Sequence, residues 1–199
     1  MGSNGYKKPG IAVVAALSLL LFLWAGPATA VPMLGGTVEY TGGDVDIEVI
    51  LAAAAFHNFL DIYDEFGTKL IELAIENHGD LGPTMETVLA ATWAGAGILP
   101  GDEAVFGIFV LDTGHTFLTG PGSRNPDGIE HAIVDDLGGG IVIVGFEDLF
   151  GGGDLDFDDT VFRFEGGVQA AVPAPASALL LGLALGGLGA WSRTRRPRA

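Results

Sequence analysis

The chain has 199 residues, no cysteine and a formal net charge of −16 at pH 7. All 25 acidic residues lie between Glu39 and Glu165, where only Lys69, Arg124 and Arg163 are basic, so that this region carries a formal charge of −22. Such a surface argues against nucleic-acid binding and favours divalent cations or basic partners, although salty surroundings also select acidic surfaces. Without disulfides, an exported domain must be held together by its core or by bound metal.

The N-terminal segment, residues 1–30, predicts a signal peptide with a helical apolar region. A short basic region precedes an apolar run over 11–24, which is short for a helix that spans a membrane. Ala28 and Ala30 are small residues at the positions that a signal peptidase reads, so we expect cleavage after Ala30. An uncleaved membrane anchor is the alternative.

Residues 31–167 predict a single acidic all-β domain, a β-sandwich of jelly-roll-like type. Glycines interrupt this region frequently, which favours short elements and tight turns. The stretch from residue 44 begins with strict alternation of acidic and apolar residues, as in a strand with one solvated face. We expect strands at 37–40, 44–55, 58–63, 104–112, 129–134, 140–146 and 160–165, whereas 69–75 and 85–93 fit either a strand or a helix.

The densest acidic cluster lies between the last two predicted strands. Three consecutive glycines, 151–153, separate its two groups of acids, and such a run can turn sharply at low steric cost. Crowded carboxylates repel one another unless they are solvated or a cation lies among them, and Ca²⁺ prefers several oxygen ligands in flexible geometry. We therefore expect a calcium loop between strands, with a solvated acidic turn as the alternative. The predicted ligands are Glu147, Asp148, Asp154, Asp156, Asp158 and Asp159.

Other polar residues give weaker signals. Asp44, Asp46 and Glu48 are expected to form a solvent-facing strand surface, with a second metal site as the alternative. The four histidines are scattered without metal-ligand spacing, and His131 is expected to be a structural hydrogen-bonding residue. No nucleophile, zinc-protease or P-loop motif is present in the sequence, so we expect no enzymatic activity.

The C-terminal part predicts a linker over 168–176 and a transmembrane helix over 177–199 that ends in an arginine cluster. This tail resembles the PEP-CTERM sorting signal, although Ala174 stands where that signal usually has Glu. The resemblance implies export, membrane attachment before processing, and recognition by an exosortase-type enzyme. A plain C-terminal anchor is the alternative. The residues that carry the resemblance are Val172, Pro173, Pro175, Arg193, Arg195 and Arg196.

The acidic cluster also resembles a family known as domain of unknown function 4114. The resemblance covers roughly 44–167, and Asp158 stands where the family usually has Asn. It implies a β-rich extracellular domain with suspected calcium binding and no established enzymatic activity. The matching residues are Gly145, Glu147, Asp148, Gly152, Gly153, Asp154, Asp156, Phe157 and Asp159.

Together these features predict an exported cell-surface or extracellular-matrix protein with a calcium-stabilised β domain. The first alternative is a carbohydrate- or matrix-binding module, which would bind a matrix polysaccharide through an exposed aromatic platform built from Tyr40, Tyr63 and Trp93. A glycosidase-like hydrolase is the third possibility, because such enzymes use paired carboxylates.

Overall fold

The computed structural model describes residues 31–171. The predicted signal helix with its cleavage residues Ala28 and Ala30 lies outside the described residues, as do the sorting signature and the predicted transmembrane helix. Within 31–171, no helix is long and apolar enough to cross a membrane.

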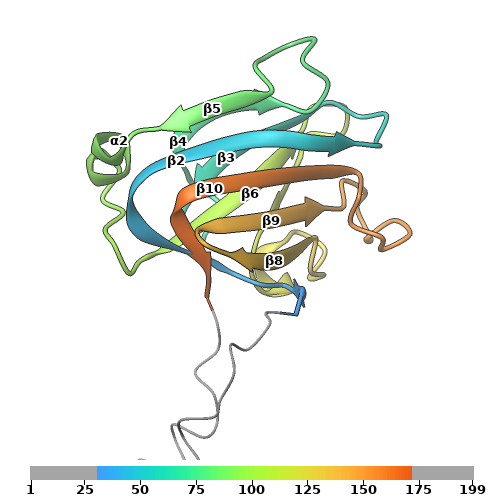
Figure 1. Cartoon of the computed structure of the whole chain (residues 1–199). Coiled ribbons are helices and arrows are strands. Elements are labelled where there is room, and N and C mark those ends of the chain that lie inside the picture. Colours follow the sequence, from blue (N-terminus) through green and yellow to red (C-terminus); the bar gives the residue numbers. More distant parts are fainter. Residues whose placement is uncertain (1–30, 172–199) are drawn as a thin grey trace, which may run out of the picture. The chain divides into compact units, whose positions relative to one another are not determined.

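The described part of the chain consists mainly of strands, which confirms the all-β prediction (Figure 1). Two short helical segments, α2 and the 3₁₀ helix η1, interrupt the strands. The elements are β1 (Met33–Leu34), β2 (Val38–Ala52), β3 (Asn58–Tyr63), β4 (Lys69–Glu76), β5 (Met85–Val88), α2 (Ala90–Gly95), β6 (Glu103–Val110), β7 (His115–Leu118), η1 (Gly122–Arg124), β8 (Ala132–Gly138), β9 (Ile141–Phe146) and β10 (Thr160–Ala170).

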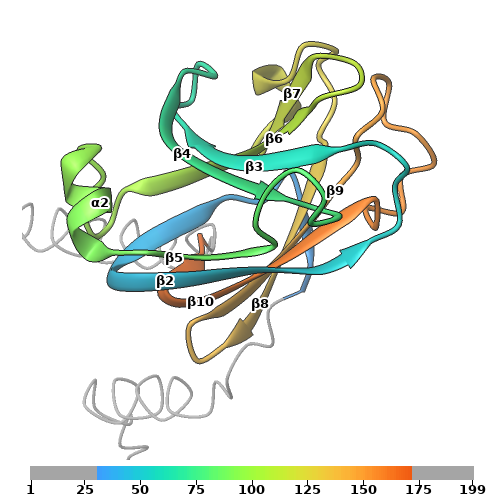
Figure 2. The same cartoon turned by 90° about the horizontal axis from the view of Figure 1, so that it is seen from above.

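The strands form one open antiparallel sheet in the order β1-β8-β9-β10-β2-β6-β3-β4, with β5 beside β2 and β7 beside β6. Strand β6 is the connection between its two halves. Its first residues, Glu103 and Ala104, pair with β2, whereas the rest of the strand pairs with β3 and β7. The sheet folds over at this point, so that β2, β5, β8 and β10 face β3, β4 and β6 (Figure 2).

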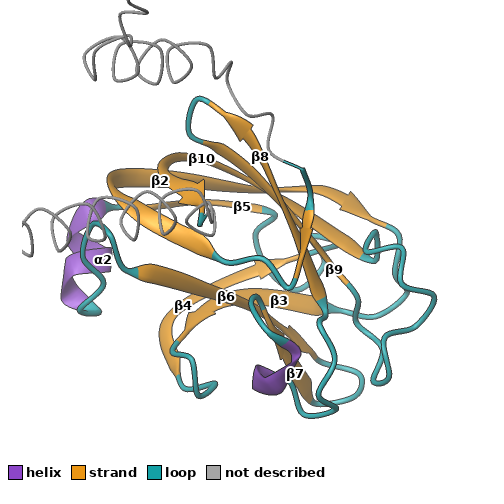
Figure 3. Ribbon diagram, turned by 90° about the horizontal axis from the view of Figure 1, so that it is seen from below, coloured by secondary structure: helices purple, strands orange, loops and turns teal. Residues whose placement is uncertain are grey.

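The hydrophobic core lies between the two facing halves of the sheet. Phe106 on β6 packs against Phe164 on β10 with their ring centroids 4.3 Å apart. Trp93 reaches the same core from α2, which covers one end of it (Figure 3). The indole of Trp93 stacks on Tyr40 at 4.7 Å and meets Phe106 edge-on at 6.2 Å. Aromatic side chains thus join strands that are distant in the sequence.

This packing is incompatible with the exposed aromatic platform that the carbohydrate-binding alternative requires. Tyr40, Tyr63 and Trp93 are only 3%, 4% and 0% exposed. Their rings therefore belong to the interior of the domain and cannot stack on a sugar at the surface, so the carbohydrate-binding alternative loses the residues on which it depended.

The structure joins segments that the sequence suggested were separate. Strand β2 runs without interruption through Gly42 and Gly43, whose φ angles of 104° and 95° suit glycine. Strand β10 continues to Ala170, three residues into the predicted linker 168–176. A side chain at Gly167 would place its Cβ 2.4 Å from the carbonyl oxygen of Gly42. These glycines mark close approach of two strands, where the sequence suggested the start of a linker.

Other boundaries also differ from those expected. Residues 85–93 contain both candidate structures, because β5 ends at Val88 and α2 begins at Ala90. The strand expected over 129–134 begins later and extends to Gly138 as β8. The short strands β1 and β7 were not predicted.

Candidate metal centre

The acidic loop, residues 147–159, connects β9 to β10 and projects from one end of the folded sheet (Figure 1). Leu155 and Phe157 adopt φ angles of 62° and 57°, a left-handed conformation that is uncommon for residues other than glycine. The loop brings together Glu147, Asp154 and Asp156, each of which offers one oxygen within 4.8 Å of the others. Three of the six predicted ligands therefore form one cluster.

Glu147 is the buried member of this cluster, with only 1% of its surface exposed. Its Oε1 accepts a hydrogen bond from the Phe157 N–H at 2.8 Å, whereas Oε2 has no hydrogen-bond partner among residues 31–171. Burial raises the pKa of Glu147, and the charges of Asp159, Asp154 and Asp156 raise it further against the lowering effect of the Phe157 hydrogen bond. The cluster thus contains a buried carboxylate oxygen to which the described part of the chain offers no positive or donating group.

Gly153 gives the Glu147 carboxylate its space. A Cβ at this position would lie 2.5 Å from Oε2 of Glu147, and the backbone here has a φ of +50°. Any other residue would therefore push the carboxylate aside and strain the backbone.

The other three predicted ligands have different surroundings. Asp148 is buried and accepts a hydrogen bond from Asn58 Nδ2 at 2.9 Å, and its own N–H donates to Asp159 Oδ2 at 3.0 Å. Desolvation and the charge of Asp148 raise the pKa of Asp159. Desolvation and the Asp156 carboxylate raise the pKa of Asp158, whose N–H donates to Asp156 Oδ1 at 3.3 Å. Asp148 and Asp159 therefore hold the loop in shape from within.

Asp127 and His131 support the acidic loop from the preceding turn. Asp127 Oδ2 accepts the Gly151 N–H at 2.8 Å and lies 2.8 Å from His131 Nε2. The other ring nitrogen, Nδ1, lies 2.9 Å from the carbonyl oxygen of Glu147, and the ring stacks on Phe117 with centroids 3.7 Å apart. His131 is fully buried and has the structural hydrogen-bonding role that the sequence suggested.

A buried amide cluster, which has no signature in the sequence, lies beside the acidic loop. Asn58 Nδ2 donates to Thr160 Oγ1 at 2.9 Å as well as to Asp148, and Asn58 N–H donates to Asn77 Oδ1 at 3.0 Å. Asn77 Nδ2 donates to the Phe56 carbonyl oxygen at 2.9 Å. These bonds connect the starts of β3 and β10 with the loop after β4, so only the tertiary fold defines the cluster.

A second group of potential metal ligands consists of His57, Glu76 and His78, whose spacing in the sequence does not suggest a metal site. His57 Nδ1 lies 2.9 Å and His78 Nδ1 lies 3.6 Å from Glu76 Oε1. Burial alone would raise the pKa of Glu76, but hydrogen bonds from the His57 ring and from backbone N–H groups lower it. The hydrogen bond to Glu76 raises the pKa of His57. The β3–β4 hairpin creates this group by bringing its two flanks together.

The acidic face of β2 is exposed to solvent, as the alternation in the sequence predicted. Asp44, Asp46 and Glu48 are all exposed. Asp46 Oδ1 accepts a hydrogen bond from the Thr87 hydroxyl at 2.6 Å, and Asp44 Oδ1 accepts the Ala90 N–H at 2.8 Å. Within the described residues, these carboxylates belong to neither group of potential metal ligands.

Comparison with known protein families matches the part of the chain that contains the acidic loop. No curated protein and no solved structure matches the chain. The matching segment, residues 107–167, begins within β6 and ends within β10. It contains Asp127, His131 and the whole acidic loop. The group of His57, Glu76 and His78 lies outside it. Residues 107–167 match the family described as "Domain of unknown function (DUF4114)".

Proposed function

We propose that the chain is an exported, non-enzymatic protein of the cell surface or extracellular matrix, whose β domain binds Ca²⁺ at the acidic loop as a structural ion. One observation carries the metal part of this proposal. Glu147 is 1% exposed, its Oε2 has no hydrogen-bond partner within the described residues, and Asp154 and Asp156 each offer an oxygen within 4.8 Å of a Glu147 oxygen. Burying an unpaired polar atom is costly, and a cation next to Oε2 would remove that cost.

The donor atoms favour calcium over a transition metal. All three side chains of the cluster offer carboxylate oxygens, which suit hard cations. Asp154 and Asp156 are exposed, so water and backbone carbonyl groups can complete the coordination shell from the solvent side. Ca²⁺ accepts such irregular shells, whereas Mg²⁺ requires near-ideal octahedral geometry.

A bound ion would stabilise the end of the domain that carries the acidic loop. The Asp159 carbonyl oxygen accepts the N–H groups of Ala53 and Ala54, both at 3.0 Å, and so connects the loop to the segment after β2. Neutralising the crowded carboxylates would remove the repulsion that opposes these contacts. We propose that the folded sheet is a jelly-roll-like sandwich whose stability rises with free Ca²⁺ by mass action.

Isothermal titration calorimetry of the purified, chelator-treated protein tests the calcium site. We expect one Ca²⁺ to bind with a dissociation constant of about 10⁻³ M or lower, because extracellular modules typically bind Ca²⁺ with dissociation constants of about 10⁻⁴–10⁻³ M. Asp156→Asn should weaken binding at least about tenfold, because it removes one charged ligand. Glu48→Gln removes one exposed acid elsewhere and should leave binding unchanged. Absence of Ca²⁺ uptake at several times the highest expected dissociation constant would refute the site.

The two ends of the sequence support export. We propose cleavage by signal peptidase after Ala30, and processing by an exosortase-type enzyme near Val172, Pro173 and Pro175, ahead of the arginine cluster. Mass spectrometry of the mature protein from its native cell tests both steps. A species that begins at Val31 and lacks the arginine cluster is expected. A mass that retains residues 1–30 would contradict signal cleavage, and one that retains the arginine cluster would contradict sorting.

A further inference from the structure

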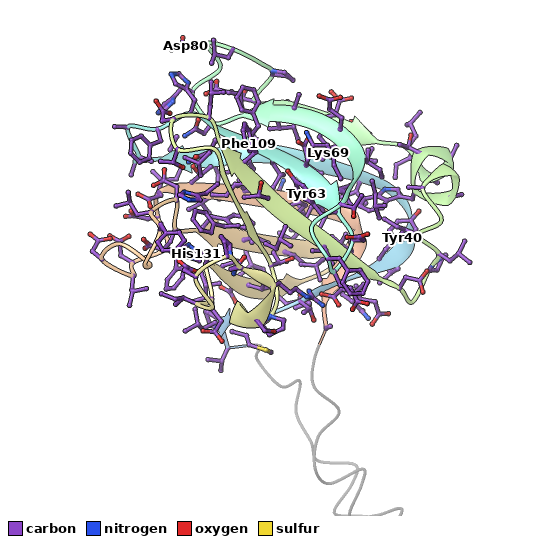
Figure 4. The ribbon with its side chains drawn as sticks, turned by 180° about the vertical axis from the view of Figure 1, so that it is seen from behind. Tyr40, Tyr63, Lys69, Asp80, Phe109 and His131 are labelled. Carbon is purple, nitrogen blue, oxygen red and sulfur yellow. The ribbon has the colours of Figure 1, made fainter. Side chains whose placement is uncertain are left out.

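His57, Glu76 and His78 meet at the ends of the β3–β4 hairpin. His57 directly precedes β3, Glu76 is the last residue of β4, and His78 lies in the following loop. Asp80, labelled in Figure 4, lies farther along the same loop. His57 and Glu76 are 19 residues apart in the sequence, yet His57 Nδ1 and Glu76 Oε1 are separated by 2.9 Å. The pairing of β3 with β4 is therefore what assembles the group.

The distances within the group suit a tetrahedral metal ion. Nitrogen and oxygen ligands about 2.0–2.1 Å from a tetrahedral Zn²⁺ lie about 3.3 Å from one another. Glu76 Oε1 lies 2.9 Å from His57 Nδ1 and 3.6 Å from His78 Nδ1, which brackets that value. One ligand atom from each of the three residues lies within 4.8 Å of the other two. Small side-chain rotations, with release of the Nδ1 proton that His57 donates to Glu76, would therefore bring all three atoms into the first coordination shell.

Hydrogen bonds hold two of the three ligands, His78 and Glu76, in the orientation that metal binding requires. His78 Nε2 lies 3.0 Å from the Ala54 carbonyl oxygen, which can only accept, so Nε2 carries the proton. In the neutral ring, Nδ1 then presents its lone pair toward Glu76. Glu76 Oε2 accepts the Asp80 N–H at 3.0 Å, which leaves Oε1 to face the two imidazoles. Metal-binding histidines are usually fixed by such a bond from the second ring nitrogen to a carbonyl group.

Burial gives the group one enclosed side and one open side. The Glu76 side chain is 0% exposed, whereas the rings of His57 and His78 are 31% and 27% exposed. A buried carboxylate between two partly exposed imidazoles faces solvent on one side, from which a water molecule could supply the fourth ligand, as in sites that have three protein ligands. The Asp112 carboxylate accepts a hydrogen bond from the backbone N–H of His57 at 2.8 Å and adds negative charge nearby. The surroundings therefore favour a divalent cation.

We propose that His57, Glu76 and His78 form a transition-metal site, with Zn²⁺ as its natural type of ion, distinct from the calcium site at the acidic loop. Two imidazoles and one carboxylate match zinc and its neighbours in the first transition series, and are a poor set for Ca²⁺. The ion would cross-link the segment before β3 to the loop after β4, in a chain that has no cysteine. Nothing in this proposal depends on the acidic loop.

The test uses the purified full chain, freed of metal with a chelator and then kept in millimolar Ca²⁺ to fill the oxygen site. Zn²⁺ is titrated by calorimetry, and Co²⁺ is used as a spectroscopic probe whose visible absorption reports tetrahedral coordination. We expect one Zn²⁺ per chain and tetrahedral Co²⁺ bands. Either His57→Ala or His78→Ala should weaken Zn²⁺ binding at least about tenfold, since each removes one of three protein ligands.

Two control variants distinguish this site from metal binding elsewhere on the chain. His115→Gln changes a histidine outside the group and should bind Zn²⁺ as the wild type does, as should Glu147→Gln at the acidic loop. NMR of the wild-type imidazole nitrogens gives a readout that needs no variant, because Zn²⁺ should shift the Nδ1 signals of His57 and His78 alone. Octahedral Co²⁺ spectra, equal Zn²⁺ affinity in all variants, or unshifted Nδ1 signals would each overturn the proposal.

Discussion

The sharpest test of the acidic loop is Glu147→Gln, because the structure predicts opposite effects with and without calcium. The substitution keeps the size of the side chain and leaves an oxygen that can accept the Phe157 N–H, which lies 2.8 Å from Oε1. It removes the charge from a group that is 1% exposed and whose Oε2 has no hydrogen-bond partner in the part of the chain that the structure describes. It also places an amide group in the cluster where Asp154 and Asp156 each offer a carboxylate oxygen within 4.8 Å of a Glu147 oxygen.

The expected magnitudes follow from these contacts. Leaving a buried polar atom unpaired costs about 1–3 kcal/mol, so without calcium the variant should be as stable as the wild type or more stable by up to about that amount. At a Ca²⁺ concentration of 100 times the dissociation constant, the wild type should gain about 2.7 kcal/mol in free energy of unfolding. For a domain of this size, that gain corresponds to a rise in melting temperature of roughly 10 °C. The variant should lose most of this rise.

Differential scanning calorimetry with a calcium chelator and then with excess Ca²⁺ measures both effects on one sample. Glu48→Gln makes the same chemical change at an exposed position of β2 and should leave the calcium-dependent rise intact. Two results would refute the assigned role of Glu147. One is a Glu147→Gln variant that retains the full rise, and the other is a calcium-free variant that is less stable than the wild type by more than about 1 kcal/mol.

Three further predictions address the surroundings of the loop and the core. Gly153→Ala should weaken Ca²⁺ binding at least about tenfold in calorimetry, because its Cβ would lie 2.5 Å from Glu147 Oε2; unchanged affinity would show that this oxygen is not a ligand. Burial pushes the pKa of Asp127 upward, but hydrogen bonds from Gly151, His131 and Ile129 outweigh it and lower the pKa. The resulting stability is therefore present above the unfolded pKa of about 3.9 and is lost as the pH falls through the lower folded value. Asp127→Asn should thus cost about 1–3 kcal/mol in urea unfolding at pH 7 and progressively less as the pH falls below about 3.9, whereas a cost independent of pH would contradict the assignment. Phe106→Ala should cost about 3–5 kcal/mol in the same assay, since Phe106 is fully buried between the two halves of the sheet, and a loss below about 1 kcal/mol would be inconsistent with that packing.

The sequence alone determined the fold class and several strands, because local patterns specify them. Alternation and β-branched or aromatic residues predicted β3 at 58–63, the residues that β3 occupies, and the strand at 140–146 differs from β9 by one residue at its start. The concentration of acids around three glycines likewise identified the loop between β9 and β10. These features depend on neighbours in the chain, so reading along the chain finds them.

Only the tertiary structure decided which polar side chains act together. The sequence does not distinguish the six acids of the loop. In the fold, Asp148 accepts a hydrogen bond from Asn58, whereas Glu147 forms a cluster with Asp154 and Asp156. Strand pairing likewise placed His57 beside Glu76, buried Tyr40 under Trp93, and extended β10 past its glycines to pair with the start of β2. Each of these contacts joins residues that are far apart in the sequence. The free energy of such a contact therefore cannot be inferred from the residues that neighbour either partner along the chain.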